Sequence, residues 1–394
     1  MKNVLVFVVS LFAAGMVVGQ SYYNEWIDYS KTYYRFKIGT TGLYRIAVSD
    51  LSGIGLANES AQNFQLWRNG KEVVLHTSTP AGPLGSGGYI EFWGEKNDGV
   101  ADRDLYKNPA NQLSNKESLL TDTAAYFLTV NAGGNNLRFQ IIENNLTGNS
   151  RAPEPYLMYS LRRNFRNRIH RGQALVAGSE YVYSSTYDVG EMWSTSDIYP
   201  ASPVSVSFSD LQVASGGPAA AFSIAMAGSA PNSRQYKVEL NNTTIVDTTL
   251  NNFTSRISYN PAVPVSLISS SSAVFKITNK SSNVNDRIVS GFFELTYPRL
   301  FNFSNQSNFA FTLPSSTASK YLEITNFNAG GSVPVLYDLT NLRRYVADVS
   351  TAGMLKFLVL PSSANAEFVL VAENSANAKS VSSFQQRIFT DYRT

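Results

Sequence analysis

Short runs with alternating apolar and polar side chains dominate the chain from about residue 33 onward. The runs 33–38 (YYRFKI) and 42–46 (GLYRI) are separated by a turn that contains two threonines, and the runs 64–68 and 71–75 flank Asn69-Gly70. A period of two is typical of a β-strand that buries one face, and Asn-Gly readily supplies the positive φ angles of a two-residue hairpin turn. The pattern therefore predicts two antiparallel hairpins, 33–46 and 64–75.

The alternation continues through three regions that are separated by clusters of Gly, Asn and Ser, such as the stretch 148–153 (GNSRAP). Many short strands at this spacing are typical of sandwich folds. We expect an all-β chain with a multidomain β-sandwich architecture of jelly-roll or immunoglobulin-like type. The expected divisions are a signal peptide at 1–20, an N-terminal β domain at 21–150, a jelly-roll-like sandwich at 151–305, a small sandwich or a completion of the preceding one at 306–375, and a linker toward a further domain at 376–394, with a short helix near Phe384.

The start of the chain has the features of an export signal. Lys2 precedes an apolar core at 4–9 and 11–14, and Val17-Val18-Gly19 leads to a cut before Gln20 or Ser21. This arrangement is typical of a cleavable signal peptide, and the apolar run is too short to span a bilayer comfortably. We expect an exported protein in the periplasm, at the outer-membrane surface or outside the cell, with no transmembrane span after cleavage.

The composition excludes several kinds of chemistry. The sequence has no cysteine, which rules out disulfides, thiol nucleophiles and thiolate metal ligands. Its two histidines are His76 and His170, and it contains no Gly-x-Ser-x-Gly, His-Glu-x-x-His or phosphate-loop motif. A net charge of +3 over 394 residues does not indicate a nucleic-acid partner. We predict no complete catalytic site, and we expect both histidines to be structural.

The densest group of carboxylates comprises Glu91, Glu95, Asp98, Asp102 and Asp104. Because Ca²⁺ prefers carboxylate and carbonyl oxygens in loops, Asp98, Asp102 and Asp104 are candidate calcium ligands, although their spacing is not that of an EF-hand. The alternative is a solvated loop with Asp-Gly turn chemistry. An acid–base pair of the glycosidase kind, for example Glu91 with Asp98, would need a separation that sequence does not give. No other cofactor is expected.

Two further groups are candidates for contacts with a partner. Arg166 and Arg168 belong to a basic run at 162–171 that could bind an anionic envelope surface, or could instead be a strand face that pairs with acids elsewhere in the chain. Trp93 and Trp193 could stack on the sugar rings of a glycan, or could fill the core, as strand aromatics usually do.

Several segments resemble one known family. They are 34–38 with 42–46, 89–94 with 97–99, 121–128, 190–193 and 337–341. These segments resemble the N-terminal β-rich region of gingipain-like cysteine peptidases of Bacteroidetes, a group that includes the sortase of the type IX secretion system. In that family, a caspase-like peptidase domain follows the β-rich region. The resemblance implies that residues 389–392 lie near the junction with such a domain. Since the catalytic cysteine of the family has no counterpart in this chain, no catalytic residue is carried over.

The leading hypothesis follows from this resemblance. It is an exported, non-catalytic β-rich region that supports a peptidase domain, docks secretion-machinery or cell-envelope proteins, or presents substrate. The chain would then be the N-terminal part of a longer protein, or a relative that lost the enzyme. The alternative is a stand-alone cell-surface module that binds a glycan or a protein partner, and a glycosidase-like enzyme ranks third.

Overall fold

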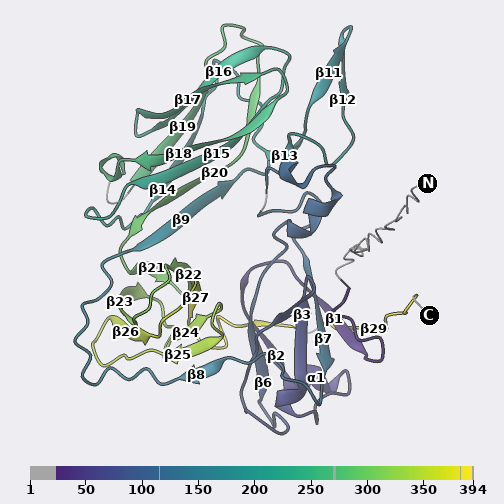
Figure 1. The fold of residues 1–394 in the computed structure, drawn as a ribbon, viewed down its shortest axis with the longest axis vertical. Coiled ribbons are helices and arrows are strands. Elements are labelled where there is room, and N and C mark those ends of the chain that lie inside the picture. Colours follow the sequence, from purple (N-terminus) through teal and green to yellow (C-terminus); the bar gives the residue numbers. More distant parts are fainter. Residues whose placement is uncertain (1–23, 115, 269–271, 382, 393–394) are drawn as a thin grey trace, which may run out of the picture.

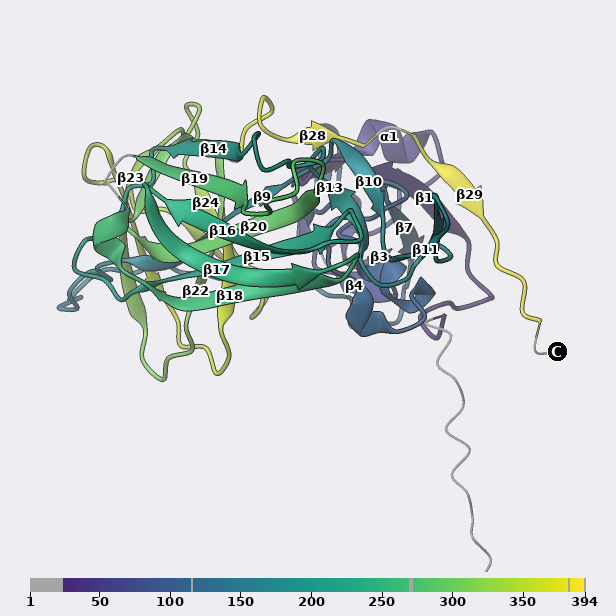
Figure 2. The same ribbon diagram turned by 90° about the horizontal axis from the view of Figure 1, so that it is seen from above.

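The computed structural model describes residues 24–114, 116–268, 272–381 and 383–392, and nearly all of its regular structure is β. The strands form three sandwich domains (Figures 1 and 2), which confirms the prediction of an all-β, multidomain β-sandwich. The predicted signal peptide at 1–20 lies outside the described residues. In the part of the chain that the structure describes, no helix is long and apolar enough to cross a membrane.

The first domain (residues 24–139 with 379–389) packs two sheets face to face. The larger sheet has the order β29-β1-β7-β3-β4 and the smaller one the order β28-β2-β6-β5. Alternate side chains point between the sheets, where the rings of Phe36, Phe92 and Tyr126 contact one another. The elements are β1 (Tyr33–Ile38), β2 (Gly42–Ala47), α1 (Val48–Ser52), η1 (Ala61–Asn63), β3 (Phe64–Arg68), β4 (Lys71–Val73), β5 (His76–Thr77), β6 (Tyr89–Gly94), η2 (Val100–Leu105), η3 (Pro109–Asn111), β7 (Ala124–Val130), β28 (Lys379–Ser380) and β29 (Gln385–Arg387).

One of the two expected hairpins is present. β3 and β4 pair across Asn69-Gly70, whose φ angles are 49° and 73°, so this prediction is confirmed. The hairpin expected over 33–46 is wrong, because β1 pairs with β7 whereas β2 pairs with β6 in the opposite sheet. The turn at 39–41 therefore carries the chain from one layer of the sandwich to the other.

The second domain (residues 157–299) has four strands in each of two sheets, with the orders β14-β19-β16-β17 and β18-β15-β20-β9. Phe222, Phe275 and Phe293 fill the space between them, and the last two rings lie 4.7 Å apart. The pair β11–β12 projects from the sandwich (Figure 1). The elements are β9 (Leu157–Asn164), β10 (Arg168–Arg171), β11 (Ala174–Ala177), β12 (Glu180–Tyr183), β13 (Glu191–Ser194), β14 (Val204–Ser209), β15 (Ala220–Gly228), β16 (Ser233–Leu240), β17 (Thr243–Asn251), β18 (Ser255–Val263), η4 (Val265–Leu267), β19 (Ser272–Asn279) and β20 (Ile288–Arg299).

The third domain (residues 302–371 with 140–142) has a hydrophobic core of its own. Its sheets have the orders β21-β23-β26 and β22-β27-β24-β25-β8. Phe303 stacks on Phe309 at 3.9 Å between ring centroids, and Tyr159 from β9 packs against both this core and that of the second domain. The elements are β8 (Gln140–Ile142), β21 (Asn302–Gln306), β22 (Asn308–Leu313), β23 (Lys320–Phe327), β24 (Val335–Asp338), β25 (Arg343–Val346), β26 (Met354–Val359) and β27 (Ala366–Val371).

After β27 the chain crosses back to the first domain through residues 372–392, which we call the return segment (yellow in Figure 1). β28 pairs with β2 in parallel and β29 pairs with β1. Val381 and Phe384 pack against the first-domain core. The short helix expected near Phe384 is wrong, because β29 starts at the next residue. Pairing with the free edge of β1 satisfies the backbone of β29, while Val381 and Phe384 beside it contact the core.

The core of the second domain gives a direct stability test. We expect Phe293→Ala to lower the free energy of unfolding of this domain by about 3–5 kcal/mol, because the substitution leaves a cavity beside Phe222 and Phe275. Leu175→Ala on β11 is the control, since Leu175 is 77% exposed and should change stability by less than about 0.5 kcal/mol. Urea unfolding followed by circular dichroism measures both. A cost for Phe293→Ala no larger than the control would contradict this assignment of the core.

Candidate functional site at the junction of the first and third domains

The first and third domains meet through a continuous apolar contact. β8 follows the first domain along the chain and pairs in parallel with β25 of the third domain. Between the two domains lies a cluster of buried apolar side chains, against which Trp93 packs. Its buried members are Leu43, Val74, Phe139, Val335, Tyr337, Val369 and Val371. This contact determines the surroundings of the polar groups in the junction.

A fully buried carboxylate lies within this junction. Glu91 on β6 sits in register between Arg45 on β2 and His76 on β5, and it is 0% exposed. Arg45 Nε donates to Glu91 Oε2 at 2.7 Å, and the hydroxyl of Tyr337 from the third domain donates to Glu91 Oε1 at 2.5 Å. A buried carboxylate is costly unless it is paired and hydrogen-bonded. Here the partners come from both domains.

A second carboxylate, Glu373, contributes from the start of the return segment. Arg344 Nη2 donates to Glu373 Oε2 at 2.5 Å, and Glu373 Oε1 lies 3.4 Å from the Tyr337 hydroxyl. Each carboxylate thus uses its Oε2 for an arginine and turns its Oε1 toward the same tyrosine. We call these residues the junction cluster: Arg45, His76, Glu91, Tyr337, Arg344 and Glu373.

Burial controls protonation in the junction cluster. Loss of hydration raises the pKa of Glu91 to about 7, and the hydrogen bond with Glu373 and its charge add to the rise. Burial also opposes ionisation of Glu373, but its hydrogen bond with Glu91 and the Arg344 guanidinium hold the pKa of Glu373 below its usual range. Burial raises the pKa of Tyr337 well above its usual value and, with the Arg344 charge, lowers the pKa of His76 to about 4. Near neutral pH these shifts keep His76 and Tyr337 uncharged and leave the Glu91 carboxyl partly protonated.

Paired carboxylates are typical of glycosidases, but this pair is closed to a substrate because Glu91 has no exposed surface. Asp98, the other member of the glycosidase pair considered from the sequence, contacts Arg68 at 3.3 Å in a separate groove. The junction cluster can instead hold two domains together through charge and hydrogen bonds, with a proton as one of its components.

The groove beside the junction has a cavity volume of about 1090 Å³. Its walls come from the β3–β4 hairpin, the segment that follows β6 and loops of the third domain. Trp93 lines it, and Arg68 within it pairs with Glu95 at 3.2 Å and with Asp98 at 3.3 Å. A concave site with aromatic walls and a few charged groups is the usual form of a small-molecule site. The remaining aromatic lining residues are Trp26, Tyr126 and Phe127.

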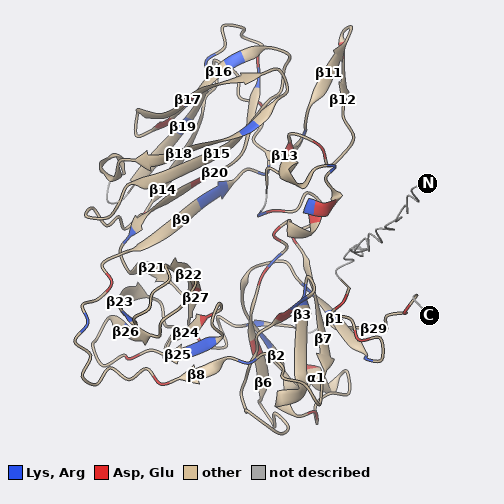
Figure 3. Cartoon of the chain, in the orientation of Figure 1, with Lys and Arg blue, Asp and Glu red and all other residues tan. Residues whose placement is uncertain are grey.

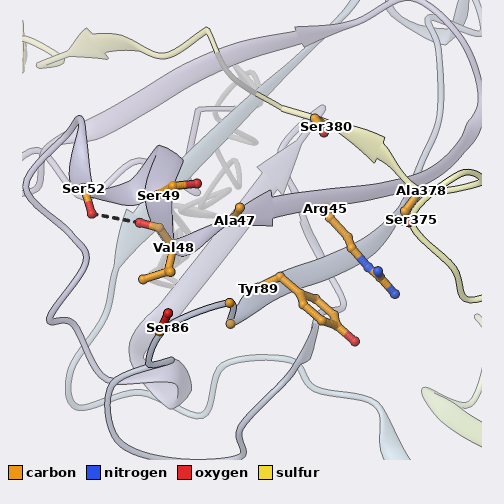
Figure 4. Close-up of a pocket in the computed structure, with 12 residues that line it drawn as sticks. Arg45, Ala47, Val48, Ser49, Ser52, Ser86, Tyr89, Ser375, Ala378 and Ser380 are labelled. Carbon is orange, nitrogen blue, oxygen red and sulfur yellow. Dashed lines mark hydrogen bonds between the residues drawn. The ribbon is translucent and has the colours of Figure 1, made fainter.

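A smaller pocket of about 410 Å³ lies between α1, the loop before β6 and the return segment (Figure 4). The Arg45 guanidinium lies 4.1 Å from the centre of the Tyr89 ring, and serine hydroxyls make up most of the polar lining. These serines are Ser49, Ser52, Ser86, Ser375 and Ser380. Because Arg45 is already paired with Glu91, the pocket offers no free charge that would select a ligand.

Two of the three calcium candidates, Asp98 and Asp104, line the groove, and Asp102 is not among its lining residues. Asp102 is buried and accepts hydrogen bonds from Ser118 Oγ and Leu119 N, both at 2.8 Å. Asp98 pairs with Arg68, and Asp104 lies in the wall of the groove. Among the described residues, no three His, Asp or Glu side chains are placed to hold one metal ion. Calcium binding by this chain stays a prediction without a formed site.

Trp193, Arg166 and Arg168 make contacts within the chain. The segment between β6 and β7 (95–114 and 116–123) reaches the second domain, and basic and acidic residues both occur along it (Figure 3). Trp193 Nε1 donates to Ser118 O at 3.1 Å, and the Arg166 guanidinium lies 4.9 Å from the centre of the Trp193 ring. Arg166 pairs with Asp122 and, at 4.0 Å, with Glu117, and Arg168 pairs with Asp197. Trp193 and Arg166 connect the first and second domains, whereas the Arg168–Asp197 pair lies within the second domain. Binding of these residues to a partner or glycan stays a prediction.

Sequence reasoning missed most of the junction cluster. Glu91 stands out only as one of several carboxylates, and Tyr337 only as the start of the segment 337–341. Tyr337 and Glu91 are 246 residues apart, so their contact depends on strand pairing that the sequence does not show. One signal was available, because Glu91 lies within a strongly apolar strand and Glu373 lies two residues after another. Such residues are rarely buried unless they are paired.

Comparison with known proteins shows a likeness of fold. No protein-family model and no curated protein matches the chain. The chain is similar to dimeric latent PorU from Porphyromonas gingivalis, with a TM-score of 0.54 and 12% identity over 88% of this chain and 32% of PorU. The chain therefore spans about a third of the length of that protein. At this identity, the likeness shows a shared fold for the β-rich region.

Two carbohydrate-binding modules align less closely. Module CBM36 in complex with calcium and xylotriose covers 34% of this chain and 98% of its own, with 14% identity and a TM-score of 0.22. The CBM36-1 domain of a multidomain xylanase from the hindgut metagenome of Trinervitermes trinervoides covers 35% and 95%, with 7% identity and the same TM-score. These scores are too low to support an argument about this chain.

The placement of Trp193 separates a structural role from a binding role. We expect Trp193→Phe to lower the free energy of unfolding by about 1–2 kcal/mol, because the carbonyl of Ser118 loses its indole donor. Thermal unfolding of the purified chain measures this. Tyr199→Phe is the control, since Tyr199 is 37% exposed and should be nearly neutral. A Trp193→Phe variant as stable as the control would show that this contact does not hold the domains together.

Proposed function

We propose that this chain is an exported, non-catalytic β-rich region of a type IX secretion sortase-like protein of the gingipain family, and that it supports or docks a cysteine peptidase domain. The observation that carries the proposal is the likeness to PorU over 88% of this chain. The matched part is 32% of PorU, so most of that protein lies outside the match. The same fold and the segments that resemble the family support this role.

The return segment supplies a physical basis for support. Phe389 packs against Trp26, Tyr33 and Phe127 of the first domain, with ring centroids 5.3–5.8 Å apart. A domain that follows residue 392 would therefore start from an anchored point on the first domain instead of a free linker. Anchoring of this kind restricts where the following domain can lie and so lowers the entropic cost of docking it.

The projecting pair β11–β12 is the surface that we propose for docking a protein of the cell envelope. Leu175 and Val182 are cross-strand partners and are 77% and 57% exposed. The opposite face of this pair is occupied, because Tyr181 and Tyr183 contact Phe253 of the second domain. Exposed apolar side chains on a projecting strand pair are typical of a protein-contact surface.

The proposed support role is tested with the full-length protein produced in its source bacterium. We expect Phe389→Ala to increase protease cleavage within 385–392 and to reduce peptidase output, because the anchor on Trp26 is lost. Ile388→Ala is the matched control, since Ile388 is 69% exposed and should leave both readouts unchanged. Equal peptidase output from the Phe389→Ala variant and the wild type would contradict the support role, as would a gene that encodes no Cys–His peptidase domain after residue 394.

The groove beside the junction favours a second candidate function, the binding of a glycan. Trp93 lies in its wall next to Arg68, Glu95 and Asp98, and an aromatic face with flanking polar groups suits a sugar ring. On an oligosaccharide array, we expect saturable binding that Trp93→Ala reduces at least tenfold. Trp193→Ala should leave the affinity unchanged, because Trp193 lies outside the groove. Binding that survives Trp93→Ala, or no binding at all, would reject this candidate.

A further inference from the structure

We propose that the junction between the first and third domains is a latch operated by one proton: the proton shared by Glu91 and Glu373 holds the two domains closed, and its loss loosens the junction and the return segment. This inference rests on the junction cluster alone and does not depend on whether a peptidase domain follows.

The two carboxylates cross the domain boundary. Glu91 belongs to β6 of the first domain, and Glu373 lies two residues beyond β27 of the third domain, at the start of the return segment. Tyr337 on β24 lies between them and has a single hydroxyl proton. That proton is donated to Glu91 Oε1 at 2.5 Å, whereas Glu373 Oε1 is 3.4 Å from the same hydroxyl. The hydroxyl can donate its proton to only one of the two Oε1 atoms. A hydrogen bond between the two carboxyl groups therefore requires one more proton.

The charged surroundings do not remove this requirement. The groups that face the pair are Arg45 on β2, His76 on β5, Tyr89 on β6, Tyr337 on β24 and Arg344 on β25. Each arginine pairs with the Oε2 atom of one carboxylate: Arg45 with Glu91 and Arg344 with Glu373. Neither arginine bonds the facing Oε1 atoms. Without the shared proton, both carboxylates would be negative beside one buried hydroxyl, and because Glu91 has no exposed surface their repulsion would be weakly screened.

The directions of the pKa shifts agree with this geometry. Burial, with Glu373 beside it, raises the pKa of Glu91 to about 7, whereas the pKa of His76 is lowered to about 4 and that of Tyr337 is raised well above its usual value. Because the pKa of Glu91 is raised in the closed state, the closed state binds the proton more tightly than an open one. The closed form is therefore favoured at low pH. As the pH rises to about 7, the equilibrium constant for closing falls by up to about tenfold per pH unit.

The latch is tested by hydrogen exchange of the full chain between pH 5.5 and 7.5, corrected for the intrinsic pH dependence of amide exchange. We expect the protection of β24 and of residues 372–381 to fall at least tenfold over this range in the wild type. In Glu91→Gln, whose amide stays neutral and can still hydrogen-bond to Glu373, protection should stay high and flat. Glu143→Gln, an exposed carboxylate just after β8, is the matched control and should keep the wild-type profile.

A second variant keeps the test decisive if Glu91→Gln does not fold. The hydrogen bond from Tyr337 lowers the pKa of Glu91, so Tyr337→Phe should move the fall in protection to higher pH. Wild-type protection that does not change with pH would overturn the latch. So would a Glu91→Gln profile with the wild-type slope, or a Tyr337→Phe profile that is unshifted or shifted to lower pH.

Discussion

The structure depends on one long-range closure, the return of residues 372–392 to the first domain. Lys379 and Gln385 bond to Thr40 and Arg35, which lie 339 and 350 residues earlier in the chain. The entropic cost of closing a loop grows only slowly with its length, and here it is offset by burial of apolar side chains. Val381 enters the core between the two first-domain sheets, and Phe384 packs on Phe36. The first domain is therefore complete only when the third domain has been built.

The closure also explains why charges are buried where they are. Bringing β24, β25 and the start of the return segment against β6 places Glu91 and Glu373 in a junction that is otherwise apolar. Removing charges from water is expensive, and the attraction between them repays this only with good geometry and further hydrogen bonds. Arg45, Arg344 and Tyr337 supply those bonds. A junction made this way is specific in its geometry and sensitive to a single proton, whereas a purely apolar contact would be insensitive to pH.

The sequence could predict the features that depend on residues close together in the chain. The class of fold and the β3–β4 hairpin follow from alternation and from Asn69-Gly70, because both depend on neighbouring residues. The 33–46 hairpin failed because alternation shows that a segment is a strand but not which strand it pairs with, and here the two strands join opposite sheets. The segment at 376–394 has little alternation, yet two short strands form in it because β1 and β2 offer free edges.

The candidate site shows the same limit. Trp93 and Asp98 stand out in the sequence, and the structure places both in the groove. Trp193, Arg166 and Arg168 stand out as well, but Trp193 and Arg166 contact the segment between β6 and β7 and Arg168 pairs with Asp197, and no local pattern reveals these contacts. The junction cluster joins residues from five strands and the return segment, so each member looks ordinary in its own sequence context.

The return segment joins the first and third domains into one unit. Urea unfolding with hydrogen exchange read separately at β1 and at β24 tests this coupling most directly. Because β1 is completed by β29 and β24 lies in the junction, both sets of amides should lose protection at one urea concentration, as they do in a single cooperative unit. Two well-separated midpoints, with β24 still protected after β1 has opened, would contradict it.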